Sequence, residues 1–203
     1  MKSVRSMLLV VLLSAGAVAF AQSDAHQMTA PKTAAPKSEA QISFDTIKTL
    51  AGEWEGPVGT DMPEPMRKAM KAQGADPDIQ PLHVTIRVTS RGNVLVHEFQ
   101  VAGTPLDATK YDHPVTMVYV DGDKLNLVHY CDAGNRPRML AKASSDAKTM
   151  AFDFAELSGS DKHGHMNNAV FTIIDANHHS EEWTYVLPNG TPIHAKFTLT
   201  RVN

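Results

Sequence analysis

Alternation of apolar and polar residues is the feature that most constrains the fold of this chain. In the segment 82–89, Leu82, Val84, Ile86 and Val88 alternate with polar residues, and the same period of two recurs in later segments up to residue 201. Side chains point to opposite faces at successive positions of a β-strand. The pattern therefore predicts a series of strands that each bury one face and expose the other.

Ten segments carry such strand patterns, and short turns such as Asp121-Gly122-Asp123 join many of them. Two short helices are also expected. One covers 44–50 with Ser43 as its N-cap, and the other, over 63–73, is an insertion between the first two strands. The predicted strands are Gly52–Gly56, Leu82–Thr89, Val94–Val101, Val115–Val120, Lys124–Cys131, Arg138–Ala143, Thr149–Ala155, Ala169–Asp175, His179–Leu187 and Ile193–Arg201.

An open meander of ten antiparallel strands has two unpaired edges, whereas closure into a barrel removes both. We therefore predict an all-β fold, an antiparallel up-and-down barrel of about ten strands. A two-sheet sandwich without a cavity is the alternative architecture. A barrel of more than eight strands is too wide for its own side chains to fill. We therefore expect an internal cavity for a small apolar or amphipathic ligand.

The start of the chain has the composition of a secretory signal. Lys2 and Arg5 precede an apolar run over 7–20, and Ala21 ends a small-x-small pattern for signal peptidase. The run is shorter than the stretch of about 20 residues that spans a bilayer, which favours cleavage over a retained anchor. We expect export to the periplasm or the extracellular space, with no stable membrane insertion afterwards.

The rest of the chain divides into a tether and one domain. Residues 22–41 are rich in Ala, Pro, Ser, Thr and Lys and lack an apolar period, which is typical of a flexible tether. The signal peptide is therefore assigned to 1–21, the tether to 22–41 and the barrel to 42–203.

Charge and cysteine content exclude several classes of function. The 19 basic and 22 acidic side chains give a net charge of −3, without a basic cluster that would bind nucleic acid or an anionic membrane. The single cysteine, Cys131, excludes an intrachain disulfide and a two-cysteine redox motif.

Two stretches of sequence resemble a known superfamily. Gly52-Glu53-Trp54 resembles the first-strand Gly-x-Trp signature of the lipocalin and fatty-acid-binding (calycin) superfamily. The stretch 121–139, which contains His-Tyr-Cys and Pro-Arg-Met, resembles secreted bacterial lipocalin-like proteins of unassigned function. The helical insertion is similar, more weakly, to those of fatty-acid-binding and nitrobindin-like barrels. The resemblance covers about residues 42–203 and implies a barrel that binds a ligand, but no known reaction.

A polar cluster at the end of one strand is the first candidate ligand site. His129 and Cys131 share a strand face with two leucines, so they would lie at one mouth of the cavity if this face points inward. Asn135 and Arg138 would then add amide and guanidinium donors. In the alternative interpretation, Asn135 holds a turn, Arg138 pairs with a carboxylate on a neighbouring strand and Cys131 is a small core residue.

A second strand contributes two further candidates. Trp183 shares its face with His179, Glu181 and Tyr185, and such a mixed face is typical of a cavity wall that contacts water. We therefore add Trp183 and Glu181 to the candidate ligand-binding residues.

The 10 histidines do not form a recognised metal motif. His163 and His165 lie in a polar loop, and the pair at 178–179 lacks the spacing of a zinc site. We predict no metal site and no cofactor. The resemblance to nitrobindin-like barrels implies a haem ligand on the last strand, where His194 is found. However, His194 shares its face with polar residues, so haem binding is kept only as an alternative.

The combined features predict an exported protein that holds a small apolar or amphipathic molecule in a barrel cavity. An enzyme acting on a small amphipathic substrate, with His129 or His163 as general base, is the second alternative. A contiguous exposed apolar patch would instead indicate a structural or partner-binding role.

Overall fold

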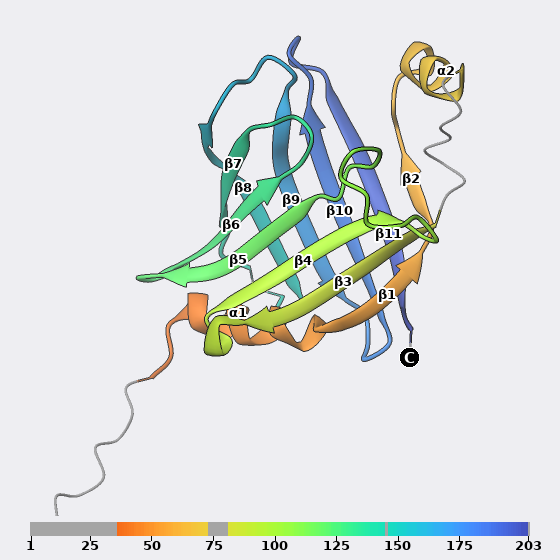
Figure 1. Ribbon diagram of the computed structural model, residues 1–203. Helices are drawn as coiled ribbons and strands as arrows, with labels where there is room; N and C mark the ends of the chain where they lie inside the picture. The colour runs from red at the N-terminus through yellow and green to blue at the C-terminus, as the bar shows by residue number, and fades with distance from the viewer. Residues whose placement is uncertain (1–35, 73–80, 145, 203) are drawn as a thin grey trace, which may run out of the picture. The chain divides into compact units, whose positions relative to one another are not determined.

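The computed structural model describes residues 36–72, 81–144 and 146–202, which form one eleven-stranded antiparallel sheet and two α-helices (Figure 1). The expected signal peptide and most of the tether lie outside these residues. The helices are α1 (Glu39–Ile47) and α2 (Glu64–Ala72). The strands are β1 (Gly52–Gly56), β2 (Val58–Thr60), β3 (Leu82–Thr89), β4 (Val94–Val101), β5 (Val115–Asp121), β6 (Lys124–Tyr130), β7 (Arg136–Ala141), β8 (Thr149–Ser158), β9 (His165–Ile173), β10 (His178–Val186) and β11 (Pro192–Val202).

The sheet closes on itself, because β11 pairs back with β1 after the strands from β3 to β11 have each paired with the next in chain order. The extra strand β2 follows β1 and pairs with the same strand, β11. Trp54 on β1 lies opposite Arg201, and Val58 on β2 lies opposite Phe197. Pro57 separates β1 from β2, since a proline has no N–H group for the ladder. The predicted ten-strand barrel and its helical insertion are therefore confirmed.

A glycine allows the close approach at this junction. A Cβ atom at Gly56 would lie only 1.9 Å from the carbonyl oxygen of Thr198 on β11. The Pro57 carbonyl then accepts a hydrogen bond of 3.2 Å from the Thr198 N–H. The barrel seam thus depends on the absence of a side chain at position 56.

Two predicted boundaries are wrong by more than three residues. Helix α1 begins at Glu39 with Ser38 as its N-cap, not Ser43, because the Ser38 hydroxyl accepts a hydrogen bond of 3.2 Å from the N–H of Gln41. The helix therefore includes residues that the sequence assigned to the tether. Strand β9 begins at His165, which we expected in a loop.

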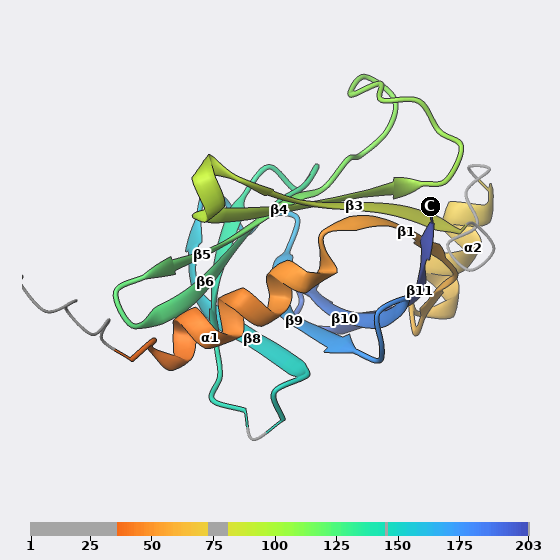
Figure 2. The same cartoon turned by 90° about the horizontal axis from the view of Figure 1, so that it is seen from below.

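Helix α1 lies across one end of the barrel (Figure 2). Its buried face carries Phe44 and Ile47, which join the hydrophobic core together with Leu50 from the following turn. The indole N–H of Trp54 donates a 2.8 Å hydrogen bond to the Leu50 carbonyl, so the first strand is tied to the segment that precedes it.

Rings fill the middle of the barrel, where we expected a hollow lumen. The ring centroids of Phe171 and Trp183 are 5.6 Å apart, and those of Phe99 and Phe197 are 5.4 Å apart. Trp54 and Phe152 are also completely buried. An aromatic side chain buries about 150–250 Å². Several such side chains pointing inward therefore occupy the width that ten strands create.

Candidate functional site

A buried carboxylate lies at the centre of the barrel. One oxygen of Glu181 on β10 is 3.0 Å from Nε2 of His97 on β4 and 3.0 Å from Nε2 of His179. The indole N–H of Trp183 donates to the other oxygen at 2.9 Å. The side chains of His97, His179 and Glu181 have no solvent exposure. The sequence assigned Glu181 and Trp183 to the wall of a wet cavity, whereas they form part of a fully enclosed polar cluster.

The cluster keeps Glu181 ionised. Burial by itself would raise the pKa of this carboxyl, but charge and hydrogen bonds from His97 and His179 outweigh it, so the pKa lies well below its usual range. A buried carboxylate is tolerated only when it is paired and hydrogen-bonded. The three donors therefore make Glu181 a structural anion.

His129 lies on the inward face of β6, which is the condition that the sequence analysis left open, but it is enclosed and not at a mouth. Its Nδ1 atom is 2.8 Å from the hydroxyl of Thr116, and its ring centroid is 5.5 Å from that of Trp183. Burial and then the charge on His97 lower the pKa of His129 to about 3. The imidazole therefore stays neutral, and the residue is only 1% exposed.

Asn135 and Arg138 take the roles of the alternative interpretation. The amide of Asn135 donates to the carbonyls of Ser160 (2.8 Å) and Gly164 (2.7 Å), which holds the turn. Arg138 lies on the outer face, where its Nε is 2.8 Å from Glu156 on β8. Neither side chain joins His129 in a common site.

Cys131 lies beside an open pocket of ≈ 480 Å³ formed by the turn after β6 and the segment 108–113. The backbone N–H of Asp132 donates to Asp112 at 3.1 Å within this pocket. Burial, and then the charge of Asp132, raises the pKa of Asp112 to about 6. Burial also raises the pKa of the Cys131 thiol, and the two aspartates add to this effect. A thiol that stays protonated is a poor nucleophile.

The remaining histidine candidates lie outside the barrel interior. His194 is on the outer face, with a side-chain exposure of 58%, and its Nδ1 is 3.0 Å from the hydroxyl of Thr184. Its side chain therefore does not point into the lumen, so it could not ligate a haem held there. The carbonyl of His163 accepts a hydrogen bond of 2.7 Å from Tyr185. Within the described part of the chain, no three or more His, Cys, Asp or Glu residues are arranged to hold a metal ion.

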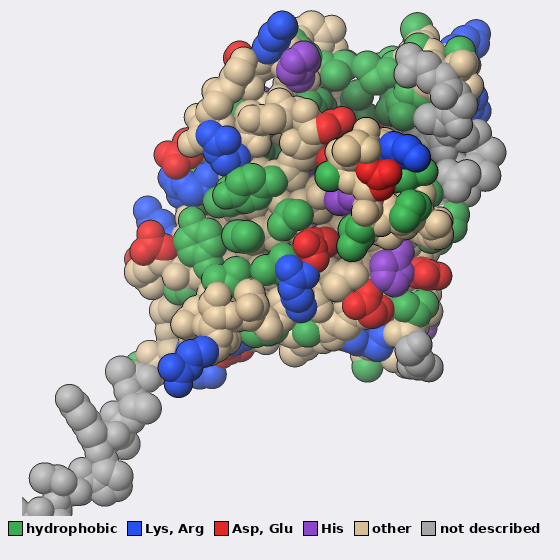
Figure 3. Space-filling model, in the orientation of Figure 1, with side chains coloured by type: hydrophobic (Ala, Val, Ile, Leu, Met, Phe, Trp, Pro, Cys, Tyr) green, Lys and Arg blue, Asp and Glu red, His purple; other side chains and the backbone are tan. Residues whose placement is uncertain are grey.

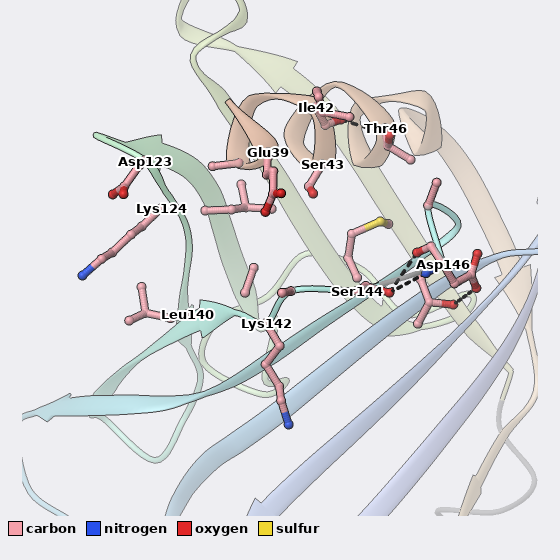
Figure 4. A pocket seen from close by; sticks show the side chains of 17 residues that line it. Glu39, Ile42, Ser43, Thr46, Asp123, Lys124, Leu140, Lys142, Ser144 and Asp146 are labelled. Atoms are coloured by element: carbon pink, nitrogen blue, oxygen red, sulfur yellow. Dashed lines mark hydrogen bonds between the residues drawn. The ribbon is translucent and has the colours of Figure 1, made fainter. Parts of the chain in front are cut away.

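A groove of ≈ 490 Å³ lies between α1 and the barrel end formed by β6, β7 and β8 (Figure 4). Leu125 and Met150, both buried members of the core, line the groove, so it reaches the hydrophobic interior. Ile42 on α1 also lines it and is 53% exposed. The other apolar residues of the lining are Ala40, Leu140, Ala141, Ala143 and Ala147, and its charged and hydroxyl residues are Glu39, Ser43, Thr46, Asp123, Lys124, Lys142, Ser144, Asp146 and Thr149.

The outer face of the sheet carries a separate apolar patch. Met117 on β5 and Tyr130 on β6 are among the exposed large hydrophobic residues. Val96 and Val128 lie on either side of Met117 in the strand register, and Figure 3 shows hydrophobic side chains gathered over this face. This patch is the feature that the sequence analysis linked to partner binding.

Sequence reasoning missed His97 and the groove, and it placed His179 on the same face as Glu181 without adding it to the candidate residues. His97 lies between Leu95 and Phe99 at a spacing of two residues, so the three share the inward face of β4. This spacing was an available signal in the sequence. The groove had no sequence signal, because it depends on where α1 packs against strands that begin more than 75 residues later. None of the described helices is long and apolar enough to span a membrane.

Neither a family model nor a curated protein matches the sequence, but solved structures do match the fold. Rv2717c from M. tuberculosis superposes with a TM-score of 0.53 at 12% identity, covering 79% of this chain and 98% of its own. A protein of unknown function from the DUF3598 family of Nostoc punctiforme gives a TM-score of 0.39 at 14% identity, covering 77% of this chain and 48% of its own. Secretory abundant heat soluble protein 4 from Ramazzottius varieornatus gives 0.32 at 13% identity, covering 77% and 96%. The similarity to Rv2717c shows that the two proteins share a fold.

Proposed function

We propose that this protein binds a small amphipathic molecule, without changing it chemically, in the groove between α1 and the end of β6, β7 and β8. The observation that carries the proposal is the groove itself, which has a volume of ≈ 490 Å³. Pockets for small molecules measure about 300–1,000 Å³ and combine an apolar lining with a few polar groups. Leu125 and Met150 provide the apolar floor, and the charged side chains surround it.

The packed centre of the barrel favours this position over the lumen. A ligand in the lumen would have to displace rings around the Glu181 cluster, which are in mutual contact. A ligand in the groove instead covers exposed apolar surface on Ile42 and meets the core at its edge. Removing this apolar surface from water favours binding.

We also propose that the protein acts outside the cytoplasm. The basic start, the apolar run over 7–20 and the small residue at position 21 support this. N-terminal sequencing of the protein recovered from a periplasmic or culture-medium fraction should begin at Gln22. Recovery of the intact chain from the cytoplasm alone would contradict export, and it would leave the binding proposal unaffected.

Titration calorimetry with decan-1-ol, decanoate and decylammonium, each below its micelle concentration, tests the binding proposal. Ala143→Trp should weaken binding at least about tenfold, because an indole would fill the groove that Ala143 lines. Two variants serve as controls. Ala108→Trp fills the pocket beside Cys131, and Ala155→Trp places the same side chain at an exposed position of β8. Both control variants should bind as the unmodified protein does.

The comparison among the three variants separates the two pockets. Loss of binding in Ala108→Trp alone would move the site to the pocket beside Cys131 and overturn our assignment of the groove. Absence of binding for all three amphiphiles at high micromolar concentration would overturn the proposed function.

A further inference from the structure

The charged side chains around the groove do not all face it. Figure 4 shows that Glu39 and Ser43 extend from α1 toward the space between the helix and the strands. The amino groups of Lys124 and Lys142 point away from this space. The groove therefore presents a carboxylate and a hydroxyl to a ligand, although two lysines contribute to its lining.

Ion pairing supports this orientation. The amino group of Lys142 is 2.9 Å from Asp153 on β8, so its charge is already engaged on the outer face. Glu39 makes no ion pair with any residue in the ranges that the structure describes. Two lysines on and beside α1 are also engaged, because Lys37 and Lys48 both pair with Asp45, at 2.6 Å and 2.8 Å.

A second carboxylate in the groove lining remains ionised. The backbone N–H of Lys148 and the hydroxyl of Thr149 donate to Asp146 at 2.9 Å and 2.7 Å. These hydrogen bonds hold the pKa of Asp146 below its usual range. The lining of the groove therefore has one carboxylate, that of Glu39 on α1, that faces the space for a ligand, and a second, that of Asp146, whose oxygens are held in a turn.

Glu39 also has a structural role, which the test must separate from ligand binding. An acidic residue in the first turn of a helix interacts favourably with the helix dipole. Glu64 occupies the same position in α2, where it lies 3.8 Å from Arg67. Glu64 is therefore a matched control for the loss of a first-turn charge.

We infer that the groove selects an amphipathic cation, such as an alkylammonium, over an amphipathic anion such as a fatty acid. The alkyl chain would lie on Leu125 and Met150, with the ammonium group beside Glu39 and Ser43. This inference rests on the proposed function, because it names the ligand class of the same site. An unpaired carboxylate beside an apolar floor attracts a cationic head group and repels an anionic one.

The test compares the dissociation constants of decylammonium and decanoate, measured by titration calorimetry at pH 7.5 and low ionic strength. Decylammonium should bind at least about fivefold more tightly to the unmodified protein. Glu39→Gln should abolish this preference, and Glu39→Lys should reverse it. Glu64→Gln should retain it, because Glu64 lies on α2 and does not line the groove. Raising the salt concentration should reduce the preference.

Each outcome bears on a different statement. Equal or tighter binding of decanoate to the unmodified protein would overturn the cation preference and leave the proposed function intact. A preference that survives Glu39→Gln would likewise overturn the role of Glu39. Absence of binding for decylammonium, decanoate and decan-1-ol alike would overturn the proposed function and this inference together, whereas binding of decan-1-ol alone would overturn this inference only. Circular dichroism of each variant, unchanged from the unmodified protein, confirms that the exposed substitutions leave the fold intact.

Discussion

The Nε2 atom of His97 lies 3.0 Å from a carboxylate oxygen of Glu181, and this hydrogen bond crosses the barrel from β4 to β10. The two residues are 84 positions apart in the chain and have no solvent exposure. The strands that carry them are not neighbours in the sheet. The contact therefore joins two walls of the barrel through its interior.

Replacing Glu181 with glutamine should lower the free energy of unfolding by about 3–5 kcal/mol, because the change breaks a buried, hydrogen-bonded charge pair. Urea unfolding followed by tryptophan fluorescence measures this difference. The adjacent Glu182 is exposed and pairs with Lys196 at 2.8 Å. Glu182→Gln should therefore change stability by less than about 1 kcal/mol. Equal effects of the two substitutions would contradict the anchoring role of Glu181.

Acid should destabilise the protein through His129. Its pKa falls from 6.5 to about 3 in the folded state, so between these values the unfolded chain binds a proton that the folded protein excludes. The stability that depends on this neutral imidazole is complete above pH 6.5 and is lost progressively as the pH falls toward 3. One proton corresponds to a slope of about 1.4 kcal/mol per pH unit. Glu181, whose pKa is lowered, adds a further loss below pH 4.5.

Unfolding free energies measured at intervals from pH 7.5 to pH 4 test this dependence. His129→Gln should reduce the slope between pH 6.5 and pH 4.5 by about one proton. His194→Gln alters an exposed ring and should leave the slope unchanged. An unchanged slope in His129→Gln would show that another group controls the response to acid.

Two glycines near the barrel seam should respond very differently to alanine. A Cβ atom at Gly56 would lie 1.9 Å from the Thr198 carbonyl oxygen, whereas one at Gly59 would meet nothing within 4 Å. Gly56→Ala should therefore cost about 3 kcal/mol or more, because the backbones of β1 and β11 must separate. Gly59→Ala should change stability by less than about 1 kcal/mol. Thermal unfolding of the two variants provides the comparison, and similar melting temperatures would be inconsistent with a tight seam.

The Cys131 thiol should react slowly in the folded protein. Burial raises its pKa, and the charges of Asp112 and Asp132 contribute to the increase, so little thiolate is present at pH 7.5. The rate of alkylation by iodoacetamide should be at least about fivefold lower than in the urea-unfolded chain. Asp132→Asn should increase the folded-state rate, because it removes one of these charges. Asp123→Asn, in the exposed turn between β5 and β6, should not. Equal rates in the folded and unfolded chain would contradict this account.

Local pattern determined which face of most strands points inward. On β11, Ile193, Phe197 and Leu199 are buried while His194 is exposed, as the period of two predicted. The same rule grouped His129 with Leu125 and Leu127 on one face of β6, which points inward in the structure. It could not reveal that His129 would be enclosed, because enclosure depends on the size of residues contributed by other strands.

The start of helix α1 also shows what the sequence pattern could and could not predict. Ser38 and Ser43 both precede apolar residues, but only Ser38 is followed three positions later by a glutamine. This is the spacing of a capping box, and the structure uses Ser38. The signal was therefore present in the sequence, and the competing apolar spacing from Phe44 obscured it.

By itself, the sequence determined the strands, most of their turns, the faces that they bury and the closure of about ten strands into a barrel. These properties depend on backbone geometry and on neighbours a few residues away. Only the tertiary structure brought His97 to Glu181 and placed α1 beside β7 and β8 to form the groove. Contacts across the lumen and between a helix and a distant barrel end depend on register, closure and side-chain volume together, and no local period encodes these.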